Sequence, residues 1–225
     1  MIREKALRRL HIHGGGRRGA EAWPHVADPD AIFVSFPADA SIADQAEELA
    51  SEHRGERLLV FAHSIGAVPA VLAAHRLEVA GLVLLEPALY DIARGHAAVE
   101  RHIGIVTEAR ARVAVGDLRG FWAIMRPLMF GGPFEAARWE DEQSLAARWA
   151  ATNLPWGHGV RERMLDGIPT LVVTGGWNEE YEAIGEIIAT RGAVHRILPG
   201  AQHRPQDLPG FADVVAEFET SLAGA

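Results

Sequence analysis

A serine stands where it could act as a nucleophile. Ser64 lies in the stretch Ala62-His63-Ser64-Ile65-Gly66, between an apolar run typical of a strand and an Ala-rich helical pattern. A serine at a sharp strand-to-helix turn is presented to substrate, and its flanks must be small, as Ala62 and Gly66 are. The helix that follows would direct its positive N-terminus at developing negative charge. The pattern predicts a nucleophile; the alternative is a serine that only caps the helix.

A histidine downstream could serve as the general base. His203 lies in the loop that starts at Pro199-Gly200, directly after the last apolar run. A histidine on a loop at the C-terminal end of a strand can reach across the sheet edge and accept a proton. The chain has eleven histidines, and only this one has that placement after the serine.

A glycine-rich loop could supply hydrogen-bond donors. His13-Gly14-Gly15-Gly16 follows the first apolar run, and its backbone N–H groups, with that of Ile65, would form an oxyanion hole. Residues 14–19 also match G-x-G-x-x-G, with Asp39 about 20 residues on, as in dinucleotide-binding sites. That reading needs a long helix, which Pro24 prevents. We therefore expect no nucleotide cofactor.

The elements that must position these residues alternate between strand and helix. The apolar runs cover residues 7–12, 31–36, 58–62, 81–86, 170–175 and 194–198, and helical patterns cover 41–54, 65–76, 179–191 and 207–222. This alternation predicts an α/β fold with a doubly wound, mainly parallel sheet of about six strands. One interval, between Glu86 and Ile168, has little strand character and suggests about four helices, with breaks near Gly95, Gly116 and Gly131. We expect one domain over residues 1–225, with a core of 1–89 and 167–225 and a helical cap inserted at 90–166.

Composition excludes several classes of function. Asp and Glu number 30 against 22 Lys and Arg, for a net charge of −8, which disfavours nucleic-acid binding. The absence of cysteine excludes thiolate nucleophiles, disulfides and Cys-ligated metals. His11 and His13 share a strand face without a third ligand, so no metal site is predicted. No apolar stretch is long enough for a signal peptide or membrane span, and we expect a soluble cytoplasmic protein.

These motifs together resemble the α/β-hydrolase superfamily. The His-Gly-Gly-Gly loop, the small-x-Ser-x-Gly turn, the helical insertion and the Gly-x-x-His phrase occur in the order typical of that superfamily, over most of the chain. The resemblance implies a Ser/acid/His triad at the C-terminal edge of the sheet, with Ser64 as nucleophile and His203 as base. It also implies oxyanion donors from Ile65 and from Gly15 or Gly16. His63 would pack against the loop or face the cap.

The acid departs from the family pattern. The position where the resemblance implies an aspartate holds Asn178, which cannot stabilise an imidazolium by charge. Three readings remain: Glu86 at the end of run 81–86, Glu179, or a neutral Asn178 that only orients the histidine. We favour Glu86, because a carboxylate ending an apolar strand needs a partner or solvent. A Glu86 oxygen would then lie about 2.6–3.2 Å from His203 Nδ1, with Asn178 farther away.

The leading hypothesis is a small, cofactor-independent serine hydrolase. It would act on a small ester, thioester, lactone or carbon–carbon substrate through an acyl-enzyme-type intermediate on Ser64. Trp122 and Trp156 in the insertion, with His63, are candidates for lining the substrate pocket. The alternative is a non-hydrolytic member of the fold that binds a ligand or serves as a scaffold, since fold alone does not fix function.

Overall fold

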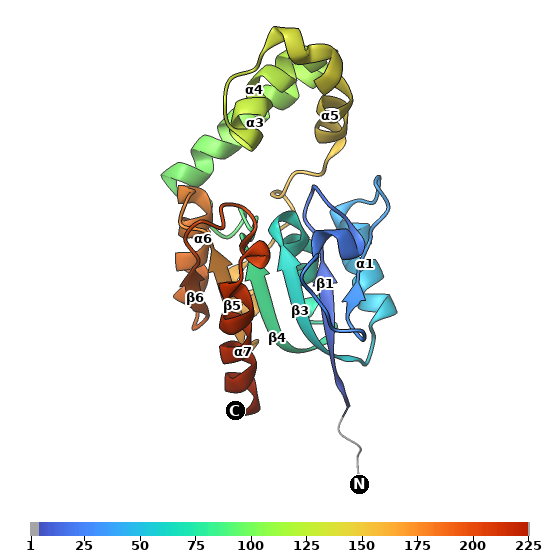
Figure 1. The fold of residues 1–225 in the computed structure, drawn as a ribbon, viewed down its shortest axis with the longest axis vertical. Coiled ribbons are helices and arrows are strands. Elements are labelled where there is room, and N and C mark those ends of the chain that lie inside the picture. The colour runs from blue at the N-terminus through green and yellow to red at the C-terminus, as the bar shows by residue number, and fades with distance from the viewer. Residues whose placement is uncertain (1–4, 225) are drawn as a thin grey trace. The chain divides into compact units, whose positions relative to one another are not determined.

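The computed structural model describes residues 5–224 and contains a six-stranded sheet (Figure 1). The strand order is β2-β1-β3-β4-β5-β6, and every neighbouring pair is parallel. The strands are β1 (Leu7–Ile12), β2 (Ile32–Phe33), β3 (Arg57–His63), β4 (Glu78–Leu85), β5 (Thr170–Thr174) and β6 (Val194–Ile197). The predicted parallel α/β sheet is confirmed.

Strand β2 is shorter than the predicted run 31–36. Only Ile32 and Phe33 pair with β1, and one further bond joins the Val34 N–H to the His11 carbonyl. Pro37 follows shortly after and has no N–H for a ladder. The edge strand is therefore a short one, as is common for sheet edges.

Helices cover both faces of the sheet. The helices of the sheet-containing part are α1 (Ile42–Glu52), α2 (Ala67–Ala74), α6 (Glu179–Ala189) and α7 (Gly210–Ala223). Helix α1 begins at a capping box, in which Ser41 Oγ accepts from the Asp44 N–H and the Asp44 carboxylate accepts from the Ser41 N–H. Within residues 5–224, no helix is both long enough and apolar enough to cross a membrane.

The core against α7 uses alternate residues of the central strands. Phe218 of α7 packs into a buried cluster with side chains from β3, β4, β5 and the segment after β1, namely Ala22, Trp23, Leu59, Phe61, Val83, Leu85, Leu171 and Val173. Gly81 lies where α7 comes closest, since an added Cβ would sit 2.8 Å from Leu222 Cδ1. Side chains that alternate along a strand point to opposite faces, so the intervening residues face the other helix layer.

Residues Gly95–Leu154 form a separate compact unit of three α-helices. These are α3 (Ala97–Ala114), α4 (Leu118–Phe130) and α5 (Trp139–Ala151). The unit is shorter than the predicted insertion 90–166, and it has three α-helices where about four were expected. The stretch 155–166 contains Pro155, Gly157 and Gly159, which disfavour helix, and forms coil and one 3₁₀ turn, Glu162–Leu165.

Asp91 explains why the ends of the predicted insertion belong with the sheet. Its carboxylate accepts hydrogen bonds from four consecutive backbone N–H groups, those of residues 157–160, at 2.7–3.3 Å. One side chain thereby fixes the returning chain to the segment that leaves β4. Charge-assisted bonds to backbone N–H groups are among the stronger hydrogen bonds in proteins.

Trp122 lies in the interior of the helical unit. Its side chain is fully buried, its indole N–H donates to Glu142 Oε2 of α5 at 2.6 Å, and its ring contacts that of Phe130. We expect Trp122→Ala to destabilise the protein by about 3–5 kcal/mol, because it leaves a large cavity. Trp122→Phe, which keeps most of the volume, should cost much less. Urea unfolding of both variants measures the difference; equal, small losses would contradict a packing role.

His11 is a buried residue whose protonation should couple to stability. Its ring stacks on Phe61, with centroids 4.6 Å apart, and meets Trp23 edge-on. Burial lowers the His11 pKa to about 4; backbone carbonyls of Ile32 and Arg9 and the Asp28 carboxylate oppose this, while the Arg9 charge adds to it. The unfolded chain therefore takes up this proton first as the pH falls.

Because the pKa of His11 is lowered on folding, the protein should lose stability as the pH falls. The contribution of neutral His11 is complete above about pH 6.5 and is lost as the pH falls towards 4, by on the order of 3 kcal/mol. His11→Phe, which keeps the stacked ring, should flatten the free energy of unfolding between pH 6.5 and 4. The same substitution at the exposed His75 controls for removal of a histidine. An unchanged pH dependence in His11→Phe would contradict the assignment.

Candidate active site

Ser64 occupies the strained turn that the sequence predicts. It follows β3 directly, has a φ of +54°, and starts a 3₁₀ turn (Ser64–Gly66) that continues into α2. A positive φ is costly for a residue with a side chain and is found mostly at functional sites. Gly66 is required by a close approach, because an added Cβ would lie 2.4 Å from the His13 carbonyl oxygen. The close neighbours are Ile12, the last residue of β1, and His13, which follows it.

Two other residues with side chains share this strain. Glu86, one residue after β4, has a φ of +44°, and Gln202, beside His203, has a φ of +47°. Among residues 5–224, Ser64, Glu86 and Gln202 are the non-glycine residues with positive φ. They flank or form the predicted triad, which indicates that the surrounding packing fixes this arrangement against a local cost.

The serine and histidine meet in the structure. His203 Nε2 lies 3.0 Å from Ser64 Oγ. Ser64 is buried, with 9% of its surface exposed, and His203 is half-buried. This distance permits a hydrogen bond from the hydroxyl to the ring nitrogen, which is the contact a nucleophile and its base require.

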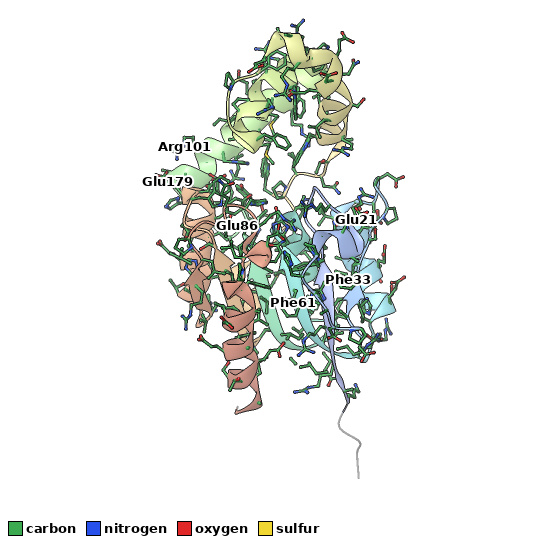
Figure 2. All side chains as sticks on the ribbon, viewed as in Figure 1. Glu21, Phe33, Phe61, Glu86, Arg101 and Glu179 are labelled. Carbon is green, nitrogen blue, oxygen red and sulfur yellow. The ribbon has the colours of Figure 1, made fainter. Side chains whose placement is uncertain are left out.

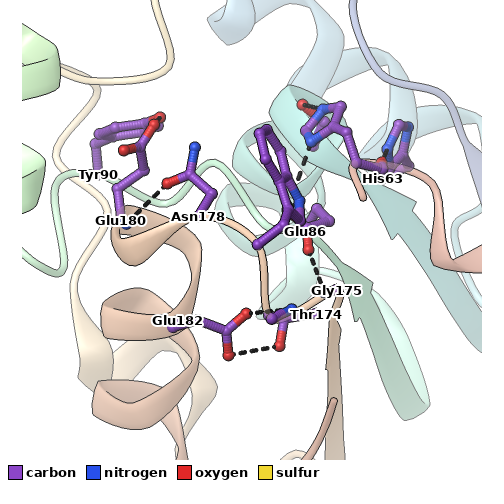
Figure 3. A network of polar contacts seen from close by, with 12 residues as sticks. His63, Glu86, Tyr90, Thr174, Gly175, Asn178, Glu180 and Glu182 are labelled. Atoms are coloured by element: carbon purple, nitrogen blue, oxygen red, sulfur yellow. Dashed lines mark hydrogen bonds and ion pairs between the residues drawn. The ribbon is translucent and has the colours of Figure 1, made fainter. Parts of the chain in front are cut away.

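Glu86 is the carboxylate beside His203. Its Oε2 lies 3.5 Å from His203 Nδ1, and its side chain is fully buried. The distance is within ion-pair range and longer than the hydrogen bond expected from the sequence; His203 Nδ1 makes no hydrogen bond within the described residues. The reason lies in other bonds of the carboxylate: Oε1 accepts from the Gly175 N–H at 2.6 Å and Oε2 from Trp177 Nε1 at 3.1 Å (Figure 3).

A polar network fixes the loop that holds Glu86. Glu182 of α6 accepts from Thr174 Oγ1 at 2.9 Å and from the Gly176 N–H at 2.9 Å (Figure 3). Gly175 lies against the loop of His203, since an added Cβ would be 2.4 Å from the Gln202 carbonyl oxygen. The loops after β4, β5 and β6 are thereby packed on one another at the C-terminal edge of the sheet.

The alternative acids lie in different surroundings. Asn178 is the N-cap of α6, where its Oδ1 accepts from the Glu180 N–H at 3.0 Å. Glu179 is the first residue of α6 and is exposed. Of the three candidates, Glu86 is the one whose carboxylate lies in ion-pair range of His203.

The glycine-rich loop lies beside the serine. An added Cβ on Gly14 would be 3.1 Å from Ser64 Cβ and 2.8 Å from His63 Nδ1, whereas one on Gly16 would meet nothing within 4 Å. Gly14 is therefore a close neighbour of Ser64 that the sequence motif did not single out. The oxyanion roles of Ile65, Gly15 and Gly16 stay predictions. The loop leads into a 3₁₀ helix, Gly19–Ala22, and not into the long helix of a dinucleotide site.

His63 positions the histidine loop. Its Nε2 lies 2.7 Å from the His203 carbonyl oxygen, and the two rings are 4.9 Å apart. Burial, and then the neighbouring His203 charge, hold the His63 pKa well below its ordinary value. A neutral His63 therefore donates its Nε2–H to that carbonyl. From the sequence, His63 is a candidate for lining the substrate pocket. In the structure, His63 contacts the loop that carries His203.

Tyr181 of α6 is a neighbour of the site that the sequence analysis missed. Its ring lies 5.1 Å from that of His203, and its hydroxyl interacts with Ser64 and with Tyr90. Burial, followed by the charges of Glu86 and Glu180, raises its pKa above the ordinary value, so the phenol stays neutral. Nothing in its helical pattern separates it from an ordinary core tyrosine.

A series of rings extends from His203. Tyr181 contacts Tyr90, which contacts Trp156 edge-on with centroids 5.5 Å apart. Trp156, half-buried, is thus joined to the site through two tyrosines, whereas Trp122 lies within the helical unit. The predicted role of Trp156 in substrate binding stays a prediction.

Comparisons with known proteins identify the fold. No family model matches the chain, and no curated protein matches its sequence. Among solved structures it is similar to MenH from S. aureus, with a TM-score of 0.62 and 14% identity over 99% of this chain and 96% of the other. A thermophilic esterase from Thermogutta terrifontis has a TM-score of 0.58 and 20% identity, over 97% and 91%. An alpha/beta hydrolase from Sphaerobacter thermophilus has a TM-score of 0.52 and 19% identity, over 95% and 93%. With the parallel sheet and the serine turn after its third strand, these likenesses show that the chain has the α/β-hydrolase fold.

Proposed function

We propose that the protein is a cofactor-independent serine hydrolase with Ser64 as nucleophile. The observation that carries the proposal is the 3.0 Å contact between Ser64 Oγ and His203 Nε2 at a strained turn. The esterases among similar solved structures are consistent with it. The triad acid in this proposal is Glu86.

The proposed reaction has two steps. Ser64 Oγ attacks a carbonyl carbon while its proton passes to His203 Nε2, and the leaving group departs with that proton. Water then attacks the acyl-serine, gives a proton to Nε2, and releases the acid as Oγ regains a proton. For Nε2 to accept, Nδ1 must carry the ring proton, which faces the Glu86 carboxylate. The N–H of Ile65 and of the glycine loop would bind the oxyanion.

The proposed substrate class rests on the aromatic surroundings of His203. The rings of Tyr181 and Trp177 lie next to that of His203, and Tyr90 and Trp156 continue the row of rings from Tyr181. The Glu86 carboxylate is fully buried. We propose a small apolar or aromatic ester, thioester, lactone or carbon–carbon substrate. The Gly95–Leu154 unit is proposed to serve as the cap.

A second candidate is a non-hydrolytic ligand-binding or scaffold protein. It is favoured by the 3.5 Å separation of Glu86 Oε2 and His203 Nδ1, without a hydrogen bond on Nδ1. A base whose tautomer is not held would be a poor catalyst. The two candidate functions therefore differ in whether Ser64 reacts as a nucleophile.

A fluorophosphonate probe followed by intact-mass measurement separates the two. We expect one adduct per chain, lost in Ser64→Ala and strongly slowed in His203→Gln. Ser41→Ala, at an exposed helix cap, is the matched control and should label like the parent. Absence of an adduct on the folded parent protein would favour the non-hydrolytic candidate.

A further inference from the structure

The hydroxyl of Tyr181 is a group at the Ser64 site to which the proposed two-step reaction gives no role. Tyr181 lies in the first turn of α6, and its side chain is buried, with 8% of its surface exposed. Its ring lies 5.1 Å from that of His203, and its hydroxyl hydrogen-bonds to Ser64. The site lies at the C-terminal ends of the strands, where Glu86 is labelled in Figure 2. The Tyr181 hydroxyl is therefore in contact with the oxygen that the mechanism makes the nucleophile.

The sheet order places Tyr181 and the glycine-rich loop on opposite sides of Ser64. The central strands are arranged β1-β3-β4-β5; Ser64 follows β3, and Tyr181 comes from the helix after β5. The glycine-rich loop follows β1, and an added Cβ on Gly14 would be 3.1 Å from Ser64 Cβ. An oxyanion bound by that loop would therefore lie on the β1 side, whereas the Tyr181 hydroxyl acts on Ser64 Oγ itself.

The protons of three neighbouring hydroxyl groups can be assigned in one direction. Each hydroxyl donates one hydrogen bond and can also accept. The Ser64 proton is directed to His203 Nε2, 3.0 Å away. The Tyr90 hydroxyl hydrogen-bonds to Tyr181 and lies 3.4 Å from Glu180 Oε1 (Figure 3). Tyr181 can accept from Tyr90, which leaves its own proton for Ser64 Oγ.

Tyr181 keeps the proton that a donor needs. Burial, followed by the charges of Glu86 and Glu180, raises the Tyr181 pKa above its ordinary value, and the hydrogen bonds to Tyr90 and Ser64 oppose the increase only in part. Burial likewise raises the pKa of Tyr90 well above its ordinary value. Both phenols are therefore neutral at any pH at which a histidine changes its charge.

A hydrogen-bond donor on Oγ favours one half of the reaction. When Ser64 attacks, Oγ shares an electron pair with the carbonyl carbon, so a hydrogen bond to Oγ does not assist the attack. In deacylation, water adds to the acyl carbon and its proton passes to His203 Nε2. The C–Oγ bond then breaks, its electron pair returns to Oγ, and Oγ takes the proton from Nε2. Oγ gains negative charge in this step, and a fixed donor stabilises that charge.

We propose that the Tyr181 hydroxyl is a catalytic hydrogen-bond donor to Ser64 Oγ that promotes the breakdown of the acyl-serine. The inference rests on the proposed hydrolase function. Tyr181 serves the departure of Oγ from the acyl group, while Ile65 and the glycine loop serve the carbonyl oxygen. The phenol therefore accelerates deacylation and leaves acylation nearly unchanged.

Tyr181→Phe tests this role, because it keeps the ring and removes the hydroxyl. With 4-nitrophenyl acetate, the first release of nitrophenolate measures acylation, and the loss of the acetyl adduct from isolated acyl-enzyme, followed by intact mass, measures deacylation. Removing one donor to a full oxyanion costs about 10²- to 10³-fold; Oγ carries part of a charge, so deacylation in Tyr181→Phe should slow at least about 10-fold. Acylation and fluorophosphonate labelling should stay within about threefold of the parent.

Tyr90→Phe is the matched variant, because Tyr90 is the other tyrosine of the chain. It removes a buried hydroxyl that hydrogen-bonds to Tyr181, and it should slow deacylation less than Tyr181→Phe does. Thermal unfolding of both variants accompanies the kinetics. A purely structural role of Tyr181 would slow acylation, labelling and deacylation together.

A second measurement does not depend on the folding of Tyr181→Phe. In Tyr90→Phe, Tyr181 is the single remaining tyrosine, so growth on 3-fluorotyrosine places one more acidic phenol of nearly the same shape at position 181. The stronger donor should speed deacylation relative to unfluorinated Tyr90→Phe and leave fluorophosphonate labelling unchanged.

Loss of the Tyr181 role and loss of the hydrolase function give different results. A parent protein that forms neither an acetyl adduct nor a fluorophosphonate adduct would overturn both. If the parent forms both adducts, four results would each overturn the role of Tyr181 alone. These are unchanged deacylation in Tyr181→Phe, acylation slowed as much as deacylation, an equal loss in Tyr90→Phe, and no faster deacylation in the fluorinated chain.

Discussion

Ser64→Ala is expected to abolish ester hydrolysis while the protein stays folded. Loss of a nucleophilic serine costs about 10³-fold or more in kcat. The side chain lost is a single hydroxyl that interacts with His203 and Tyr181, and alanine relieves none of the φ of +54°, so the free energy of unfolding should change little. The measurement is steady-state hydrolysis of a short-chain activated ester, with thermal unfolding in parallel.

Ser41→Ala is the control for Ser64→Ala. Ser41→Ala removes a hydroxyl from an exposed helix cap and should cost about 1 kcal/mol of stability with no loss of kcat. If Ser64→Ala retains more than about a tenth of the parent activity with its fold intact, the acyl-enzyme mechanism is wrong.

Glu86→Gln is expected to lower kcat by on the order of 10³- to 10⁴-fold with little change in KM. The substitution keeps the shape of the side chain but removes the charge that would stabilise protonated His203 and hold its Nδ1–H. The same loss should appear in the rate of fluorophosphonate labelling, because both reactions need the base.

Asn178→Ala provides the comparison for Glu86→Gln. Its amide caps α6, so its removal should lower stability by about 1 kcal/mol and leave kcat within a few-fold of the parent. The buried Glu86 carboxylate also accepts from Gly175 and Trp177, so Glu86→Gln needs an unfolding measurement beside its kinetics. A folded Glu86→Gln with parent-like kcat, or an Asn178→Ala that loses activity, would transfer the acid role away from Glu86.

Local features of the chain determined much of the fold and part of the site. Short apolar runs between helical patterns predicted the parallel sheet, because parallel strands are buried on both faces. The small-x-Ser-x-Gly phrase located the turn of Ser64, since that turn requires glycine at 66. The loop after the last strand located His203, because the C-terminal ends of parallel strands meet at one edge.

Tertiary packing decided what no local pattern could. The separation of Glu86 from His203 depends on the bonds that Gly175 and Trp177 make to the same carboxylate. The proximity of Tyr181 depends on how α6 packs against the loops after β4 and β6, and a buried tyrosine has no sequence signature that distinguishes these roles. The buried cluster under α7 joins Ala22 and Trp23 to residues of β3, β4 and β5 and to Phe218, which lie up to about 200 positions apart in the chain. Such contacts are fixed by the fit of side chains across the sheet, which the periodicity of a single segment does not record.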